Sequence, residues 1–130
     1  MKRRAVVLAI CAMPLGACSS TTAIGAEFVV RVDSISGPTA VSGGIPAQQR
    51  LWGTVGPAAC TAFKELRTTR VPSQMDVTVI GERADATCAS GATAALNGLV
   101  VQIEPPILGN FLFVVHQPDG SALQRSILGE

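Results

Sequence analysis

The chain has 130 residues, 48% of them hydrophobic, and its ten Lys and Arg nearly balance nine Asp and Glu, for a formal net charge of +1. Three of the basic residues lie at positions 2–4, and the other seven are spread along the chain. Because a nucleic-acid-binding domain usually gathers its cations into a patch or stripe, this distribution argues against a nucleic-acid partner.

The first residues have the pattern of a targeting signal. Basic residues 2–4 precede an apolar run, Ala5 to Leu15, which at about 1.5 Å per helical residue is too short to cross a hydrocarbon core of about 30 Å. Small residues then lead to Cys18. This stretch resembles the lipobox of bacterial lipoproteins, which implies cleavage after residue 17 and attachment of lipid, including palmitate, to Cys18. The alternatives are an ordinary secretory signal and an uncleaved anchor.

The lipobox resemblance also implies a location, which is the cell envelope, with the membrane contacted through the N-terminal lipid. Ser19 stands where the sorting signal that this pattern resembles has an aspartate to retain lipoproteins at the inner membrane, so we expect the outer membrane, bordering the periplasm. We therefore divide the chain into a signal peptide (1–17), the lipidated Cys18 with a short tether (18–26) and one domain (27–130). Without its signal the chain carries seven basic and nine acidic side chains, a formal charge of −2.

The cysteines predict one disulfide once the signal is set aside. Cys11 leaves with the signal and Cys18 takes the lipid, so Cys60 and Cys88 remain as a pair in an oxidising compartment. They lack the Cys-x-x-Cys spacing of a redox or zinc motif, and the single histidine, His116, cannot complete a four-ligand zinc site with them. We expect no metal site.

From Glu27 onward the pattern is that of an all-β domain. Short runs rich in Val, Ile, Thr and Phe alternate with Gly and Pro, and no stretch shows a sustained helical period. Strands are predicted over residues 28–33, 48–55, 60–70, 75–79, 99–103, 111–116 and 121–128. Residues 84–98 are predicted as a loop tied down by Cys88, with a short helical turn over residues 93–96 as an alternative. About seven antiparallel strands in about 100 residues favour an immunoglobulin-like β-sandwich, and a small barrel is the alternative.

Two segments carry a further resemblance. The proline- and glycine-marked corner over residues 106–111 with the turn at residues 117–120, and the opening strand and bend over residues 32–38, are similar to immunoglobulin-like domains of small bacterial lipoproteins. Phe111 stands where such domains commonly carry a tyrosine, so a hydroxyl hydrogen bond at this corner is excluded. The resemblance implies a fold and a compartment, and it implies no activity.

No pattern in the chain indicates catalysis or a cofactor. A Gly-x-Ser-x-Gly elbow and a phosphate-binding glycine motif are both missing from the sequence, and His116 lies in an apolar strand. We predict that the chain is not an enzyme. The four phenylalanines, at positions 28, 63, 111 and 113, are predicted to pack in the core. Trp52 is out of phase with Leu51 and Val55, so we expect it on an exposed sheet face where a partner or a sugar could stack.

These observations favour one function class and leave a second open. The first is a non-catalytic interaction or structural module that is tethered by lipid and presents a sheet face or loops to an envelope protein partner. The alternative is an inhibitor or sensor of an exported enzyme, acting through the 84–98 loop.

Overall fold

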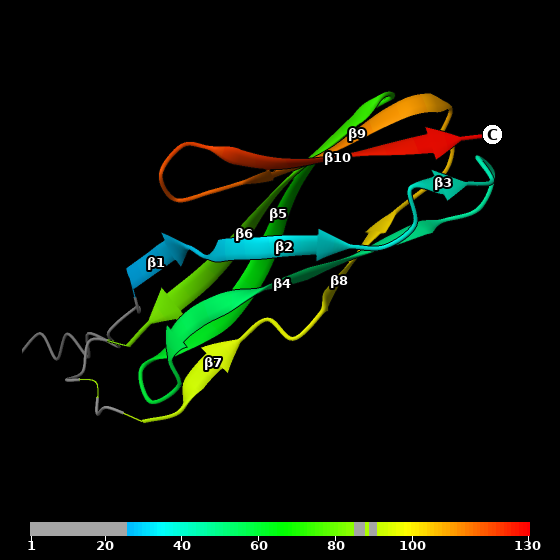
Figure 1. Cartoon of the computed structure of the whole chain (residues 1–130). Helices are drawn as coiled ribbons and strands as arrows, with labels where there is room; N and C mark the ends of the chain where they lie inside the picture. Colours follow the sequence, from blue (N-terminus) through cyan, green and yellow to red (C-terminus); the bar gives the residue numbers. More distant parts are fainter. Residues whose placement is uncertain (1–25, 85–87, 89–90) are drawn as a thin grey trace, which may run out of the picture.

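The computed structural model describes residues 26–84, 88 and 91–130. Ten strands form two sheets packed face to face (Figure 1). The strands are β1 (Ala26–Val29), β2 (Arg31–Ser36), β3 (Ala40–Val41), β4 (Ala47–Pro57), β5 (Thr61–Val71), β6 (Gln74–Arg83), β7 (Thr93–Ala95), β8 (Leu99–Ile103), β9 (Gly109–His116) and β10 (Ala122–Gly129). The predicted all-β sandwich is confirmed. The predictions for the signal peptide and for Cys18 lie outside the described residues, and the part of the chain that is described contains no helix long and apolar enough to cross a membrane.

Each sheet is organised around one long strand. In the six-stranded sheet A, β5 runs along one edge of β6, while β1 and β9 share the other edge, and β10 and β3 follow beyond β9. In the four-stranded sheet B, β2 runs along one edge of β4, while β7 and β8 share the other. Two of the pairings, β6 with β9 and β3 with β10, are parallel, which the expectation of about seven antiparallel strands did not include.

The strand predicted over residues 28–33 divides between the two sheets. β1 pairs with β6 of sheet A, β2 pairs with β4 of sheet B, and the buried Val30 separates them and donates its N–H to Val79 O at 2.8 Å. Phe28, Val30 and Val32 still alternate toward the core across this change of sheet. Because each sheet supplies one wall of the same core, the period-2 pattern gives no sign of the switch.

Polar side chains of the β9–β10 hairpin bind the backbone of β2 and close one side of the sandwich. Gln117, which is 7% exposed, donates from Nε2 to Val32 O at 2.7 Å and accepts from Val32 N–H at 3.0 Å. The Arg125 guanidinium donates to Ile35 O at 3.2 Å and also to Gly37 O. These groups occupy the edge of β2 that does not face β4, so they stand where a further strand would otherwise pair.

The core confirms most of the predicted alternation. Leu51 and Val55 of β4 face the same interior as Val77 and Val79 of β6 and the central residues of β9. The buried cluster comprises Val30, Val32, Ala47, Leu51, Val55, Met75, Val77, Val79, Leu96, Val101, Ile103, Ile107, Phe111, Phe113, Val115 and Ile127. Its members come from both sheets, so the core is the space between them.

The prediction that Phe63 packs in this core is wrong, because its side chain is 40% exposed. Phe63 and Phe28 lie opposite the same residue, Gly81 of β6. The Phe28 ring fills the space above that glycine, since a Cβ added to Gly81 would come within 2.6 Å of its Cζ. Phe63 is therefore left at the rim of the sandwich.

Two connections can be compared with their predictions. The turn at residues 117–120 joins β9 to β10 as expected, with Gly120 at φ +85°. Asp119 accepts hydrogen bonds from Ser121 Oγ at 2.6 Å and Ser121 N–H at 2.9 Å, and these bonds lower the pKa of Asp119. The helical turn considered over residues 93–96 is instead strand β7, which pairs with the last residues of β4. Thus the second half of the predicted 84–98 loop is built into sheet B.

Candidate functional site

Trp52 lies on the outer face of sheet B, in the middle strand β4. Its side chain is 42% exposed, whereas the preceding residue, Leu51, is fully buried on the inner face. The indole Nε1–H donates to Ser36 Oγ at 2.9 Å. A Cβ added to Gly98 would lie 3.0 Å from two atoms of the six-membered ring, so the ring rests against Gly98. The predicted exposure of Trp52 is confirmed, and its role in partner contact stays a prediction.

The strand register defines the surroundings of this ring. Ser34 of β2 lies opposite Trp52, and Arg50 lies opposite Ser36 on one side and Val100 of β8 on the other. We call the exposed surface formed by Ser34, Ser36, Arg50, Trp52, Thr54 and Val100 the Trp52 patch. It combines one aromatic ring, one aliphatic side chain, three hydroxyl groups and one cation.

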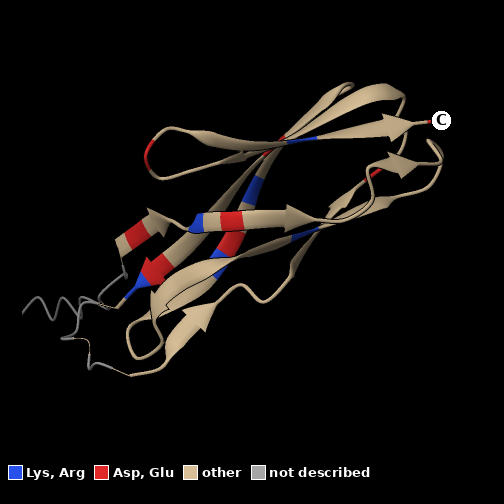
Figure 2. Ribbon diagram, in the orientation of Figure 1, with Lys and Arg blue, Asp and Glu red and all other residues tan. Residues whose placement is uncertain are grey.

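The cation of this patch differs in its contacts from the cations on the outer face of sheet A. There, Lys64 and Arg67 bind the Glu27 carboxylate at 2.5 and 2.7 Å, and these hydrogen bonds lower the pKa of Glu27. Charged residues of β1, β5 and β6 are visible in Figure 2. Within the described residues Arg50 makes no ion pair, and its guanidinium donates one long hydrogen bond of 3.5 Å, to Gly98 O.

A hollow of about 530 Å³ adjoins the Trp52 patch and shares Ser36 and Arg50 with it. The remaining walls come from the β2–β4 connection and the first residues of β4, including Ser42, Ile45 and Gln48. Ile45 is 60% exposed, so the hollow has an apolar wall open to solvent. The fully buried Gln49 fixes the loop beneath it by donating from Nε2 to Pro38 O at 3.0 Å.

A second hollow, of about 590 Å³, lies between β5 and the end of β8. Arg70 crosses it, donating to Pro106 O at 2.8 Å with its guanidinium carbon 4.4 Å from the centre of the Phe111 ring. The Arg70 guanidinium already contacts a carbonyl oxygen and an aromatic ring. It is therefore less available to bind a ligand than Arg50, whose single hydrogen bond is long.

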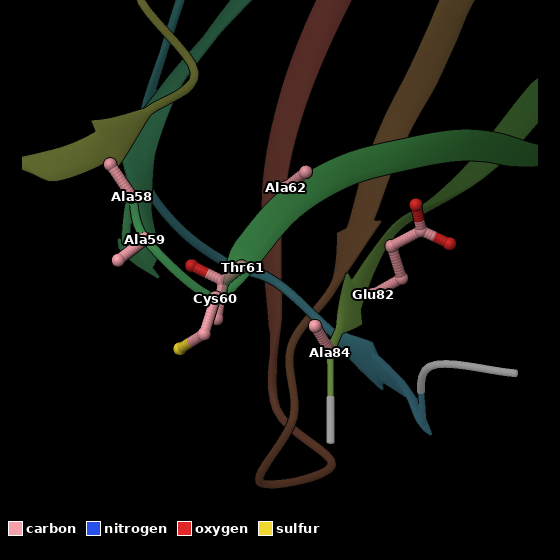
Figure 3. A pocket seen from close by; sticks show the side chains of 7 residues that line it. All are labelled: Ala58, Ala59, Cys60, Thr61, Ala62, Glu82 and Ala84. Carbon is pink, nitrogen blue, oxygen red and sulfur yellow. The ribbon is translucent and has the colours of Figure 1, made fainter. Parts of the chain in front are cut away.

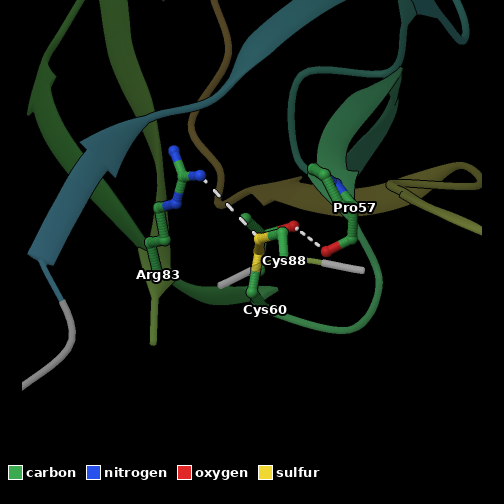
Figure 4. Close-up of a disulfide and its surroundings, with 5 residues drawn as sticks. Pro57, Cys60, Arg83 and Cys88 are labelled. Atoms are coloured by element: carbon green, nitrogen blue, oxygen red, sulfur yellow. Dashed lines mark hydrogen bonds between the residues drawn. A yellow bond between two sulfur atoms is a disulfide. The ribbon is translucent and has the colours of Figure 1, made fainter. Parts of the chain in front are cut away.

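The predicted disulfide between Cys60 and Cys88 is present, with Cα atoms 5.5 Å apart (Figure 4). Thr61 Oγ1 donates to Pro57 O at 2.7 Å across the same turn, and Arg83 Nη2 lies 3.8 Å from Cys88 Sγ. The adjacent hollow of about 330 Å³ is lined mainly by alanines, and the Glu82 carboxylate points away from Cys60 (Figure 3). Among the residues that the structure describes at this end of the domain, the disulfide is a structural link and no group of potential metal ligands adjoins it.

His116 ends strand β9 and pairs with a residue that the sequence did not connect to it. Its Nε2 lies 2.8 Å from Asp76 Oδ1, and Gln74 Nε2 donates to both oxygens of Asp76, at 3.1 and 3.0 Å. No hydroxyl or thiol joins His116 in the hydrogen bonds of the described chain, and no three potential metal ligands cluster there. The pair therefore lacks the nucleophile of a hydrolytic triad in this part of the chain.

The fold and these surfaces define a small all-β sandwich domain with an exposed tryptophan on the outer face of sheet B. No family model matches the chain, and comparisons with curated proteins and with solved structures find no similar protein. The Trp52 patch and its hollow are therefore the candidate functional site of this chain.

Trp52 is the sole tryptophan, so its fluorescence reports directly on this surface. Because the ring is partly exposed, acrylamide should quench the native protein to a large fraction of the extent seen after unfolding in urea. Ser36→Ala removes the partner of the indole N–H and should lower the fluorescence anisotropy of the ring without changing the unfolding midpoint greatly. Native fluorescence that resists acrylamide would contradict the exposed position.

Proposed function

We propose that this chain is a lipid-anchored, non-catalytic binding module of the bacterial cell envelope, held at the outer membrane, which presents the Trp52 patch to another envelope component. The lipobox pattern ending at Cys18 supports the anchor, and the Cys60–Cys88 disulfide fits an oxidising compartment. The outer face of sheet B supports the binding role.

The observation that carries this proposal is that Trp52 is exposed yet fixed from two sides. Ser36 holds its N–H and Gly98 supports its ring, so contact with a partner would cost little further side-chain entropy. Tryptophan is also among the side chains that contribute most to binding energy where an interface covers them. An exposed aromatic ring held in this way is ready for contact before any partner arrives.

In-cell crosslinking tests the binding role. A diazirine amino acid, which inserts into protein and sugar alike, is placed at Thr54 in the Trp52 patch or at the exposed Gln124 on sheet A as the control position. We expect a discrete adduct from position 54 that disappears when Trp52 is also changed to alanine, and no such adduct from position 124. Equal adducts from both positions, or an adduct that does not depend on Trp52, would overturn the proposal.

The anchor is tested separately. Cys18→Ser removes the thiol that would carry the lipid, so the variant should take up no labelled palmitate and should remain as the uncleaved precursor. The wild-type chain should be labelled and should fractionate with the outer membrane. Since two or more acyl chains anchor a protein stably, the unlabelled precursor should be missing from the outer-membrane fraction. Labelling that survives the substitution would contradict the lipobox assignment.

A further inference from the structure

The hollow beside Trp52 has the chemistry of a site for a charged sugar. We propose that the Trp52 patch and this hollow bind a carboxylated glycan, with one sugar ring stacked on the indole and its carboxylate held by Arg50. This inference rests on the proposed function, because it assigns a ligand class to the same surface.

The stacking half of the site follows from how Trp52 is held. Its one polar group, the indole N–H, is occupied by Ser36, and one region of its ring rests on Gly98. The part of the ring that remains exposed is an apolar π surface with a negative face, which attracts the slightly positive C–H groups of an apolar ring edge or face. A pyranose presents such C–H groups on one side and its hydroxyls around the rim.

The charge of the surface indicates that the sugar carries a carboxylate. Arg50 is the sole charged residue among those of the Trp52 patch and those that line the hollow. Arg31 lies opposite Thr54 at the end of the patch, and its guanidinium is 3.7 Å from the Asp119 carboxylate. The Arg50 guanidinium has no carboxylate partner in the described residues, and its one bond to Gly98 O is long. A planar guanidinium offers donors in the geometry of a carboxylate and binds it by two parallel hydrogen bonds. The surface therefore complements one negative charge next to a stacked ring.

The walls of the hollow suit the remaining groups of a sugar. Ser36 and Ser42 carry hydroxyls that both donate and accept, and Gln48 carries an amide. Together these groups can form hydrogen bonds with the hydroxyls of a sugar ring. The volume of about 530 Å³ falls within the range of about 300 to 1,000 Å³ that is common for small-molecule sites. Exposed Ile45 and two prolines supply the apolar part of the wall.

The position of the patch disfavours an acidic peptide strand as the occupant. A peptide that adds to a sheet needs a free strand edge for its backbone hydrogen bonds. Trp52 lies on β4, whose edges are taken by β2 on one side and by β7 and β8 on the other. A ligand on this face therefore cannot be held by the strand-edge hydrogen bonds that an added peptide strand needs, which favours a glycan.

Binding of three polymers by the full chain, purified in detergent micelles, tests the inference. The probes are polygalacturonate as the carboxylated glycan, dextran as the neutral glycan and polyglutamate as the acidic peptide. Titration calorimetry, together with Trp52 fluorescence, should show saturable binding of polygalacturonate alone. Arg50→Gln should weaken it by about tenfold or more, since a charge-assisted hydrogen bond contributes about 1.5 to 3 kcal/mol and 1.4 kcal/mol corresponds to tenfold. Trp52→Ala should weaken it to a similar extent.

Matched variants on sheet A serve as controls. Arg67→Gln removes an exposed cation, and Phe63→Ala removes an aromatic ring as exposed as Trp52, so neither should change the affinity. The urea midpoint of each variant shows that it is folded. Equal binding of polyglutamate, equal binding of dextran, equal loss in Arg67→Gln, or no binding of polygalacturonate would each overturn the inference. A Trp52-dependent crosslink to a protein in cells, with no glycan bound, would leave the proposed function standing and remove this ligand.

Discussion

Replacing Gln117 with alanine should lower the free energy of unfolding by about 2 to 5 kcal/mol, because it leaves two buried backbone groups without partners. The Gln117 side chain binds both the N–H and the C=O of Val32, at the point where the chain has just passed from sheet A to sheet B. Val32 is almost completely buried, so water cannot replace the lost amide without opening the fold. Urea unfolding followed by circular dichroism measures the difference.

Two further variants show whether the hydrogen bonds of Gln117 cause the predicted loss of stability. Gln124→Ala removes an exposed glutamine from the same hairpin and should change stability by less than about 0.5 kcal/mol. In Gln117→Glu the carboxylate would face Val32 O without a proton to donate, which should raise its pKa in the folded state. Its stabilising contribution should then be present in acid and be lost as the pH rises through that pKa, whereas Gln117→Ala should show no such change. A loss for Gln117→Ala no larger than that for Gln124→Ala would contradict the assignment.

Removing the Cys60–Cys88 disulfide should cost about 3 to 4 kcal/mol of stability. The two cysteines are 28 residues apart, and closing a loop of this length restricts the unfolded chain by about that amount on the chain-entropy model. The link also joins the β4–β5 turn to the segment that returns to sheet B at β7. The double variant Cys60→Ala/Cys88→Ala, which leaves no unpaired thiol, is the one to unfold in urea.

Reduction supplies the control for this prediction. Wild-type protein unfolded in the presence of a reductant should have the midpoint of the double variant, and the double variant should not respond to the reductant. A free-thiol assay on denatured, unreduced mature protein should find none at these positions. A stability difference below about 1 kcal/mol would mean that the native state or the reduced chain compensates for the lost constraint.

The positions of the strands could be predicted from local sequence patterns. Which strands pair with one another could not. The alternation at Met75, Val77 and Val79 and the turn ending at Gly120 depend on neighbours in the chain, and the structure confirms both. Pairing of β6 with β9 joins residues about 38 apart in parallel, and no local signal specifies it. The Asp76–His116 contact depends on that pairing, so the sequence could not connect these two residues.

The prediction that Phe63 is buried was wrong because hydrophobic period and residue type do not show which other side chains occupy the same space. Hydrophobic period and residue type predict an inward direction, and Phe63 does lie opposite Gly81 as an inward residue of β5 would. The space there is already filled by Phe28 from β1, which only the sheet order reveals. Competition between two aromatic rings for one small site decided the result.

The exposure of Trp52 could be predicted from the sequence, but the residues that surround it could not. The phase of Trp52 against Leu51 predicts an outward ring, because successive residues of a strand point to opposite faces. Ser36, Gly98 and Arg50 come from three separate segments of the chain, and they meet only because β2 and β8 flank β4. One sequence signal for Gly98 existed, since Asn97-Gly98 is a dipeptide suited to left-handed backbone, and both residues have positive φ.

The change of sheet at Val30 also sets the path that a mechanical load would take through the domain. Tension applied at Ala26 would enter through the short pairing of β1 with β6, pass Val30 and reach β2, which lies directly beside the strand that carries Trp52. The Cys60–Cys88 link lies outside that path. A domain pulled from its N-terminal end would thus transmit force to the face that carries Trp52 through a single neighbouring strand, and the β1–β6 pairing would be loaded before the Gln117 amide that binds Val32.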